Sequence, residues 1–232
     1  MRKLGLIGGV SWASTIRYYE LINRAVHKRL GGLHSARLAV ESLDFADVAR
    51  CVTQDDWDCA GNHVVGAAKR LEDGGAEALL ICANSLHRLY DPVVAAVNIP
   101  VIHIVDVIGA KLRADGVRSV ALIGTSNVML DKNYRQRLVR QGVTLLPGDP
   151  ELALRIDGIV YDELSTGKTS REAERYMKSE MTDIAKEGVK AVVLACTELE
   201  MVVDVQANVL PIYDGTSIHA TAGADFMLGE PA

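Results

Sequence analysis

The feature that most constrains the fold is an internal repeat. When the chain is shifted so that Leu6 meets Leu122, Gly8 falls on Gly124, and "LGLIGGVSWASTIRYYELINR" and "VALIGTSNVMLDKNYRQRLVR" agree in order. A nearby register places "GGAEALLICANSLH" on "EGVKAVVLACTELE", and both copies are followed by a proline-led strand, "IPVIHI" and "LPIYD". Agreement in order over such lengths indicates two halves of similar fold, related by duplication.

Short apolar runs alternate with helical patterns along both halves. The apolar, β-branched runs are "KLGLIG", "RLAVES", "EALLIC", "PVIHIV", "SVALIG", "VTLLP", "AVVLAC" and "LPIYD". Between them, stretches such as 55–73 and 170–187 carry apolar residues at three- and four-residue steps, which is the helical period. Strands that alternate with helices predict parallel sheets covered on both faces. We therefore expect an α/β protein of two pseudo-symmetric domains, each a roughly four-stranded parallel sheet flanked by helices.

The two expected domains are not contiguous in sequence. We expect the helix after "PVIHIV" to cross between the halves, and residues 215–228 to return and pack on the first half. The predicted boundaries are 1–104 plus 214–232 for the first domain and 105–213 for the second. The chain has 232 residues, of which 49% are hydrophobic, so each half is large enough to bury a core.

Composition narrows the classes of partner. The net charge is −5 and no long basic run occurs, so we expect neither a nucleic acid nor an acidic membrane surface as a partner. The first apolar run, Leu4 to Val10, is too short to span a membrane and no small-residue cleavage site follows it, so we expect a cytoplasmic protein. The cysteines fit no disulfide framework or metal spacing, and we expect free thiols and no bound metal; they are Cys51, Cys59, Cys82 and Cys196.

The carboxyl ends of the parallel strands are the expected place for a ligand. Loops and helix N-termini meet there, and their free N–H groups attract anions. If the halves face each other across a pseudo-twofold axis, these loops line one active-site cleft between the domains. Neutral hydrogen-bond donors suited to a carboxylate follow the strands. Beside them lie Glu198 and the pair Ser11 and Trp12, which we expect at the wall of the cleft. The candidates for substrate binding are Ser11, Trp12, Asn84, Ser85, Thr125, Ser126, Thr197 and Glu198.

Cys196 is the residue that offers chemistry at this edge. It follows a buried strand in "LACTEL", at a strand end near a helix N-terminus, which favours the thiolate. The matching position in the first half is Ala83. Cys82 is one residue away, but side chains along a strand alternate between faces, so we expect Cys82 to be a buried structural thiol.

Four ordered motifs carry a resemblance to a known family. The segments "GLIGGVSWASTIRYYELIN", "CANSLH", "ACTEL" and "PIYDGTSIHATA" resemble the aspartate/glutamate racemase family, in particular its cofactor-independent amino-acid racemases, over nearly the whole chain. The resemblance implies two thiols on opposite faces of the substrate Cα, no pyridoxal phosphate or other cofactor, a small amino acid or dicarboxylate as ligand, and a homodimer. It also places Gln54 in a segment that reads the distal group of the substrate.

The sequence departs from this family at Ala83, where the first thiol would fall. Alanine can neither take nor give a proton, so with Cys196 alone we expect exchange of the α-proton of one enantiomer, and slow or one-sided racemisation. Two alternatives stay open. One is a decarboxylase with a single thiol, like the arylmalonate decarboxylase of the same superfamily, and the other is a non-catalytic protein that binds acidic ligands.

Overall fold

The computed structural model describes residues 1–229, which form two compact units. Unit 1 comprises residues 1–104 together with the chain from His219 onward, and unit 2 comprises residues 105–218. Residues 230–232, the end of the predicted first domain, lie outside the described residues. Within residues 1–229 no helix has both the length and the apolar character that a membrane crossing requires.

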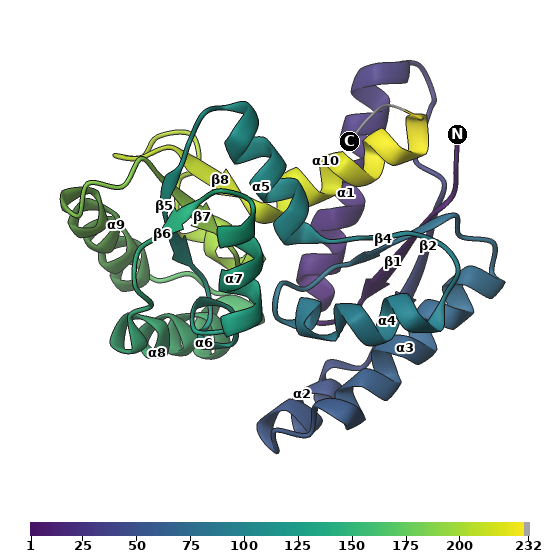
Figure 1. Ribbon diagram of the computed structural model, residues 1–232, viewed down its shortest axis with the longest axis horizontal. Coiled ribbons are helices and arrows are strands. Elements are labelled where there is room, and N and C mark those ends of the chain that lie inside the picture. The colour runs from purple at the N-terminus through teal and green to yellow at the C-terminus, as the bar shows by residue number, and fades with distance from the viewer. Residues whose placement is uncertain (230–232) are drawn as a thin grey trace. The chain divides into compact units, whose positions relative to one another are not determined.

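The strands and helices follow the predicted alternation in both units (Figure 1). Unit 1 contains β1 (Leu4–Gly8), α1 (Trp12–Leu30), β2 (Leu38–Ser42), α2 (Phe45–Thr53), α3 (Trp57–Asp73), β3 (Ala78–Ile81), η1 (Ser85–Leu89), α4 (Tyr90–Ala96) and β4 (Val101–Ile102). Helix α5 (Ile104–Ala114) begins at the last residue of the first segment of unit 1 and continues in unit 2. Unit 2 also contains β5 (Ser119–Ile123), α6 (Ser126–Met129), α7 (Lys132–Arg140), β6 (Thr144–Leu145), α8 (Pro150–Gly158), η2 (Ile159–Glu163), η3 (Leu164–Thr166), α9 (Arg171–Lys186), β7 (Ala191–Leu194), η4 (Thr197–Met201) and β8 (Ile212–Asp214). Helix α10 (Gly215–Leu228) begins in unit 2 and ends in unit 1.

The two sheets have the same topology. The strand order is β2-β1-β3-β4 in unit 1 and β6-β5-β7-β8 in unit 2, and every neighbouring pair is parallel. In the central pairs, Ile7 is opposite Ile81 and Ile123 is opposite Leu194. The predicted fold class, two parallel four-stranded sheets flanked by helices, is therefore confirmed, and the sequence repeat corresponds to a repeat of topology.

Strand alternation divides the core of unit 1 between the two faces of its sheet. Leu6 and Leu80 point to one face and pack with residues of α1 and α10, among them Ile22 and Ala224. On the other face, side chains of β1 and β3 such as Ile7 pack with residues of α2, α3 and α4. Residues of α10 thus pack on the same face of this sheet as those of α1.

The core of unit 2 has the same two-sided plan. One face of its sheet packs with α8 and α9, whose buried side chains include Met177 and Met181. Helices α5 and α7 lie on the side of this sheet away from α8 and α9 (Figure 1). Both central strands of each sheet are thus covered on both faces, which is why they read as continuous apolar runs rather than as alternating ones.

The expectation of four free thiols is wrong for two of them, because Cys51 and Cys59 form a disulfide with their Cα atoms 5.6 Å apart. The physical reason is the short turn between α2 and α3. The backbone N–H of Asp56 donates to the carbonyl oxygen of Cys51 at 2.9 Å, which folds the start of α3 back against the last turn of α2. The other two cysteines, Cys82 and Cys196, are free and buried.

Candidate active site

Backbone hydrogen bonds at the strand ends show that Ala83 occupies the position in unit 1 that Cys196 occupies in unit 2. The N–H of Cys82 donates to the carbonyl oxygen of Ile7 at 2.9 Å, and the N–H of Ala195 donates to the carbonyl oxygen of Ile123 at 2.7 Å. The residue after each of these donors is the first beyond the paired strands. The alignment made from sequence is therefore also the structural alignment.

The first half-site, as we define it, comprises Ser11, Trp12, Ala83, Asn84 and Ser85 at the carboxyl ends of β1 and β3. These two strands are hydrogen-bonded neighbours, so their end loops lie side by side. Ser11 and Asn84 are buried, and Ser85 is partly buried. Ser11 caps α1 by accepting a hydrogen bond from the N–H of Ser14 at 3.3 Å. The half-site offers neutral hydrogen-bonding groups and no group that titrates near neutral pH.

Two residues of unit 1 that were predicted to bind substrate are exposed, unlike the buried Ser11 and Asn84. Trp12 is 64% exposed, and its place in a wall of the cleft stays a prediction. Gln54 is exposed and follows the last residue of α2. It therefore belongs to the turn between α2 and α3 and not to a strand end, and its role in reading the substrate stays a prediction.

The second half-site comprises Thr125, Ser126, Cys196, Thr197 and Glu198 at the carboxyl ends of β5 and β7, which are also hydrogen-bonded neighbours. Its centre is the thiol of Cys196, which is buried and donates to a carboxylate oxygen of Glu198, with Sγ and Oε2 3.2 Å apart. This arrangement gives unit 2 a nucleophilic and titratable group that unit 1 lacks at the equivalent place.

The helix N-terminus near Cys196 favours the thiolate, as expected from sequence, but two larger effects oppose it. Burial raises the pKa of the Cys196 thiol well above its usual value, and the charge of Glu198 and its hydrogen bond to the thiol raise that pKa further. The backbone N–H groups of Glu198 and Leu199 act in the opposite direction, as expected at a helix N-terminus, but their effect is smaller. The resting thiol is therefore protonated at neutral pH.

Three residues that support the second half-site were not among the candidates identified in sequence, although Thr216 lies in the motif "PIYDGTSIHATA". Asp157 on α8 holds Ser126, whose N–H donates at 2.9 Å and whose hydroxyl donates at 2.5 Å. The hydroxyl groups of Thr197 and Thr216 are hydrogen-bonded at 2.9 Å. Burial raises the pKa of the Tyr161 phenol, and the charge of Asp157 and then that of Cys196 raise it further, so Tyr161 lies in the same electrostatic surroundings. Each of these residues is remote in sequence from the group it supports.

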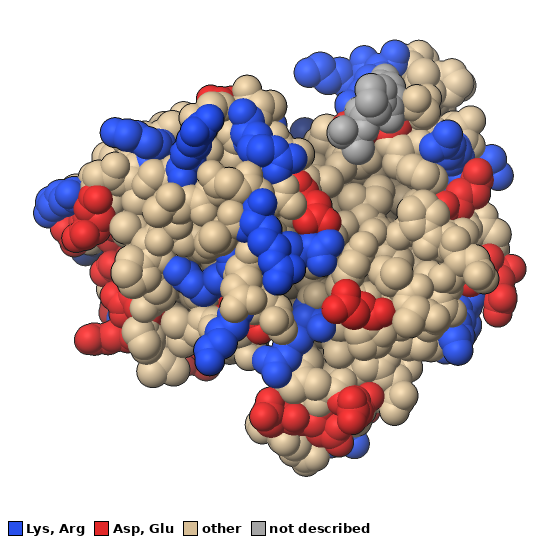
Figure 2. Space-filling model, viewed as in Figure 1, with Lys and Arg blue, Asp and Glu red and all other residues tan. Residues whose placement is uncertain are grey.

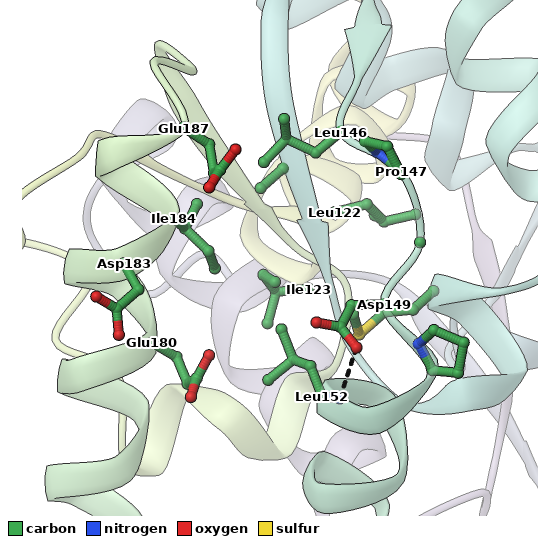
Figure 3. Close-up of a pocket in the computed structure, with 14 residues that line it drawn as sticks. Leu122, Ile123, Leu146, Pro147, Asp149, Leu152, Glu180, Asp183, Ile184 and Glu187 are labelled. Carbon is green, nitrogen blue, oxygen red and sulfur yellow. Dashed lines mark hydrogen bonds between the residues drawn. The ribbon is translucent and has the colours of Figure 1, made fainter.

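A pocket of ≈ 460 Å³ lies elsewhere in unit 2, between β5, α9 and the loop that follows β6 (Figure 3). Its floor is apolar and four carboxylates stand around it; the lining residues are Ala121, Leu122, Ile123, Met129, Leu146, Pro147, Gly148, Asp149, Pro150, Leu152, Glu180, Asp183, Ile184 and Glu187. None of the residues predicted for the site lines this pocket. It lacks a thiol and the neutral donors expected for a carboxylate, so the two half-sites are the better candidate.

Comparison with known proteins finds similar sequences and similar folds. The sequence model of a family described as Asp/Glu/hydantoin racemase matches residues 7–223. A protein of Yersinia pestis described as a candidate Asp/Glu racemase is 35% identical, with a TM-score of 0.91 over 98% of this chain and 100% of that chain. An aspartate racemase homologue from Pyrococcus horikoshii OT3 is 26% identical, with a TM-score of 0.85 over 98% and 100% of the two chains. The aspartate racemase of Picrophilus torridus, at 16% identity and a TM-score of 0.75 over 98% and 94%, shares the fold.

Proposed function

Because the chain belongs to the Asp/Glu/hydantoin racemase family, we propose that it is a cofactor-independent amino-acid racemase that moves the α-proton of an acidic amino acid with one thiol. The observation that carries this proposal is the unequal pair at the strand ends, a thiol at Cys196 and a methyl group at Ala83. The proposal requires one substrate to be bound by both half-sites, as the sequence led us to expect.

The reacting group in this proposal is the thiolate of Cys196. Glu198 already accepts the hydrogen bond of the thiol, and it is the proposed acceptor of that proton when the thiolate forms. Burial makes the thiolate scarce, but by raising the pKa it also makes the thiolate a stronger base toward a carbon-bound proton. The neutral donors Asn84, Ser85 and Thr197 are proposed to bind the substrate carboxylate.

The step that completes inversion is the one that Ala83 impairs. A proton must reach the opposite face of the substrate Cα, and the methyl group of Ala83 has none to give. Water or the hydroxyl of Ser85 would have to supply it. Loss of a positioned acid or base typically costs about 10²- to 10⁴-fold in rate, so exchange of one enantiomer should run well ahead of inversion.

The test is a panel of substrates in heavy water. Each enantiomer of aspartate and glutamate, and an arylmalonate, is incubated with the protein, and deuterium at Cα, inversion and carbon dioxide release are measured. We expect deuterium uptake from one enantiomer to be faster than inversion. This uptake should disappear in Cys196→Ala. Equal uptake from both enantiomers would contradict the one-thiol mechanism.

The same panel separates the alternatives. Carbon dioxide release from the malonate without exchange of either amino acid would identify a decarboxylase, for which a single thiol is a favourable arrangement. Heat of binding in calorimetry with no chemistry would identify a binding protein.

The proposal also includes a homodimer that works in the cytoplasm. Sedimentation equilibrium is expected to give twice the chain mass of 25.1 kDa. A species at the chain mass itself, at the concentrations used for the activity assays, would refute the dimer without touching the proposed chemistry.

A further inference from the structure

Two sulfur atoms and an imidazole gather at the turn between α2 and α3, apart from both half-sites. Cys51 lies in the last turn of α2, and Cys59 and His63 lie one helical turn apart on α3. Their ligand atoms all lie within 4.8 Å of one another. Cys51 is buried, whereas Cys59 and His63 are partly exposed, so the cluster is open to solvent on one side.

The backbone of the turn holds these three side chains together independently of any bond between them. Residues four apart on a helix share a face, which directs Cys59 and His63 to the same side of α3. The carboxylate of Asp56 caps α3 by accepting from the N–H of Cys59 at 2.9 Å. The N–H groups of Gln54 and Asp55 donate to carbonyl oxygens in the last turn of α2 at 3.0–3.3 Å. The cluster is therefore built into the fold of the turn.

The charge around the cluster favours a cation. Residues 51–63 include Asp55, Asp56 and Asp58 and contain no lysine or arginine. Figure 2 shows acidic side chains gathered where Figure 1 places α2. The adjacent arginines are engaged, since Arg50 is paired with Asp47 and Arg88 lies over the ring of Trp57 with its guanidinium carbon 4.3 Å from the centroid.

Two thiolates and an imidazole form a donor set that suits zinc. Zn–S distances of about 2.3 Å and Zn–N distances of about 2.0–2.1 Å place neighbouring ligand atoms of a tetrahedral site roughly 3.3–3.8 Å apart. Donor atoms within 4.8 Å of one another reach that spacing by small side-chain movements. The side open to solvent leaves the fourth position for a water molecule.

In the structure Cys51 and Cys59 form a disulfide, which has no thiolate to offer. We propose that the reduced pair, together with His63, binds one Zn²⁺, and that the disulfide is the metal-free form of the same site. Two molecules of a small thiol supply two electrons and two protons to the disulfide and become a disulfide themselves. Zn²⁺ then displaces the two cysteine thiol protons, which pass to solvent.

The experiment is a zinc titration of the whole protein in both oxidation states. The protein is reduced with a monothiol, freed of it without oxygen, and titrated with Zn²⁺ against a chromophoric chelator; a second sample keeps the disulfide. One Zn²⁺ per chain is expected in the reduced sample and none in the oxidised one. Co²⁺ in place of Zn²⁺ should give a thiolate-to-cobalt charge-transfer band, which reports sulfur ligands directly.

Variants test the ligand set. His63→Ala, which keeps both cysteines, and Cys59→Ser should each weaken Zn²⁺ binding at least about tenfold. His27→Ala, at an exposed histidine of α1, and Cys196→Ala should leave binding unchanged. Circular dichroism checks that each variant is folded.

Three results would overturn the proposal. The first is a reduced protein that binds no stoichiometric zinc. The second is binding that Cys196→Ala removes and Cys59→Ser spares. The third is a Cys51–Cys59 bond that resists reduction while the protein remains folded, as judged by alkylation and mass spectrometry.

Discussion

Position 83 differs from position 196 by one functional group, and the proposed chemistry depends on that difference. Replacing Ala83 by cysteine places a thiol at the partly buried strand end that matches Cys196. The Ala83→Cys variant should invert both enantiomers faster, by about 10²-fold or more, because a positioned acid replaces water. Chiral chromatography of the products measures this.

The matched control is Ala83→Ser. It adds a side chain of similar size whose hydroxyl is far too weak an acid to replace a thiol. If cysteine raises the rate of inversion no more than serine does, a thiol at position 83 is not the missing proton donor.

Glu198 sets how readily Cys196 ionises. Burial is the larger cause of the raised pKa of Cys196, and the carboxylate of Glu198 is the next, because it disfavours a second negative charge beside it. In Glu198→Gln the burial remains and the charge is removed, so the pKa of Cys196 should fall. The rate of iodoacetamide alkylation plotted against pH should shift to lower pH. Glu200→Gln, in the same turn, is the control, and an unshifted profile in Glu198→Gln would reject this role.

Sequence alone placed some residues correctly and others not. The opposite faces of Cys82 and Ala83 follow from strand alternation, and Cys82 packs with Leu80 as a buried thiol whose pKa burial raises. The disulfide was missed because an eight-residue spacing across a helix–helix turn is not a pattern of sequence. The helix N-terminus that favours the thiolate of Cys196 is visible in sequence, whereas the burial that outweighs its effect on the pKa is not.

At the scale of elements, His219 joins three segments of unit 1. Its Nε2 lies 2.9 Å from the carbonyl oxygen of Ile102, at the end of β4, and its Nδ1 lies 2.8 Å from the hydroxyl of Tyr18 on α1. A carbonyl oxygen can only accept, so Nε2 carries the proton and Nδ1 accepts from Tyr18. The neutral ring therefore satisfies both neighbours, whereas a second proton would place a positive charge in the buried interior of unit 1.

This arrangement predicts a pH dependence of stability. Burial lowers the pKa of His219 from 6.5 to about 4. Since the unfolded chain takes up the proton first, the stabilisation is complete above pH 6.5 and is lost as the pH falls toward 4. The shift corresponds to about 3 kcal/mol in the free energy of unfolding.

Urea denaturation at pH 7 and pH 4 measures this loss, and His219→Gln should reduce the difference between the two pH values relative to the wild type. Replacement of the exposed His27 by glutamine should not. An unchanged pH difference in His219→Gln would show that this ring is not the group responsible.

Elements were more predictable than their contacts. All eight strands fall within the apolar runs identified in sequence, because buried parallel strands need such runs. The repeat failed to show that the counterpart of α1 is broken into α6 and α7, where Asp131 caps a new helix by accepting from the N–H of Tyr134 at 2.6 Å. The bonds that tie α10 to α1 and β4 join residues too distant in sequence for any local pattern to reveal.

At the scale of the whole molecule, the two units share a topology but differ in packing at an equivalent position of their sheets. Gly5 on β1 and Ala121 on β5 are equivalent in the repeat. A Cβ atom at Gly5 would lie 2.7 Å from Cδ2 of Leu79, so unit 1 has no room there. Ala121 instead lines the pocket of unit 2, where α9 packs through residues such as Met177. The duplicated fold has therefore diverged in its interior as well as at its strand ends.

Equivalent enlargements should consequently have opposite effects on the two units. Gly5→Ala is expected to destabilise by about 1–3 kcal/mol through overpacking. Ala121→Val should stabilise by roughly 0.5–2 kcal/mol, because its added methyl groups fill space beside an apolar floor. The urea concentration at the midpoint of unfolding, compared between each variant and the wild type where the m-values are equal, measures both effects. A loss of stability in both variants would mean that the pocket does not accept side-chain atoms.

The fold class could be predicted because it depends on patterns repeated many times along the chain. The pocket could not, because it results from how closely one helix approaches a sheet. The candidate site lay between these cases: its strand-end residues were predictable, but the partners that orient them, such as Asp157 and Thr216, were not.

The burial of Cys196 also affects the resistance of the protein to oxidation. Peroxides and electrophilic metabolites attack the thiolate form of exposed cysteines, and a sulfur that is both protonated and covered offers them little. The same burial that disfavours ionisation thus protects from oxidation the sulfur to which the proposed mechanism assigns proton transfer, and Ala83 at the equivalent position offers no second sulfur.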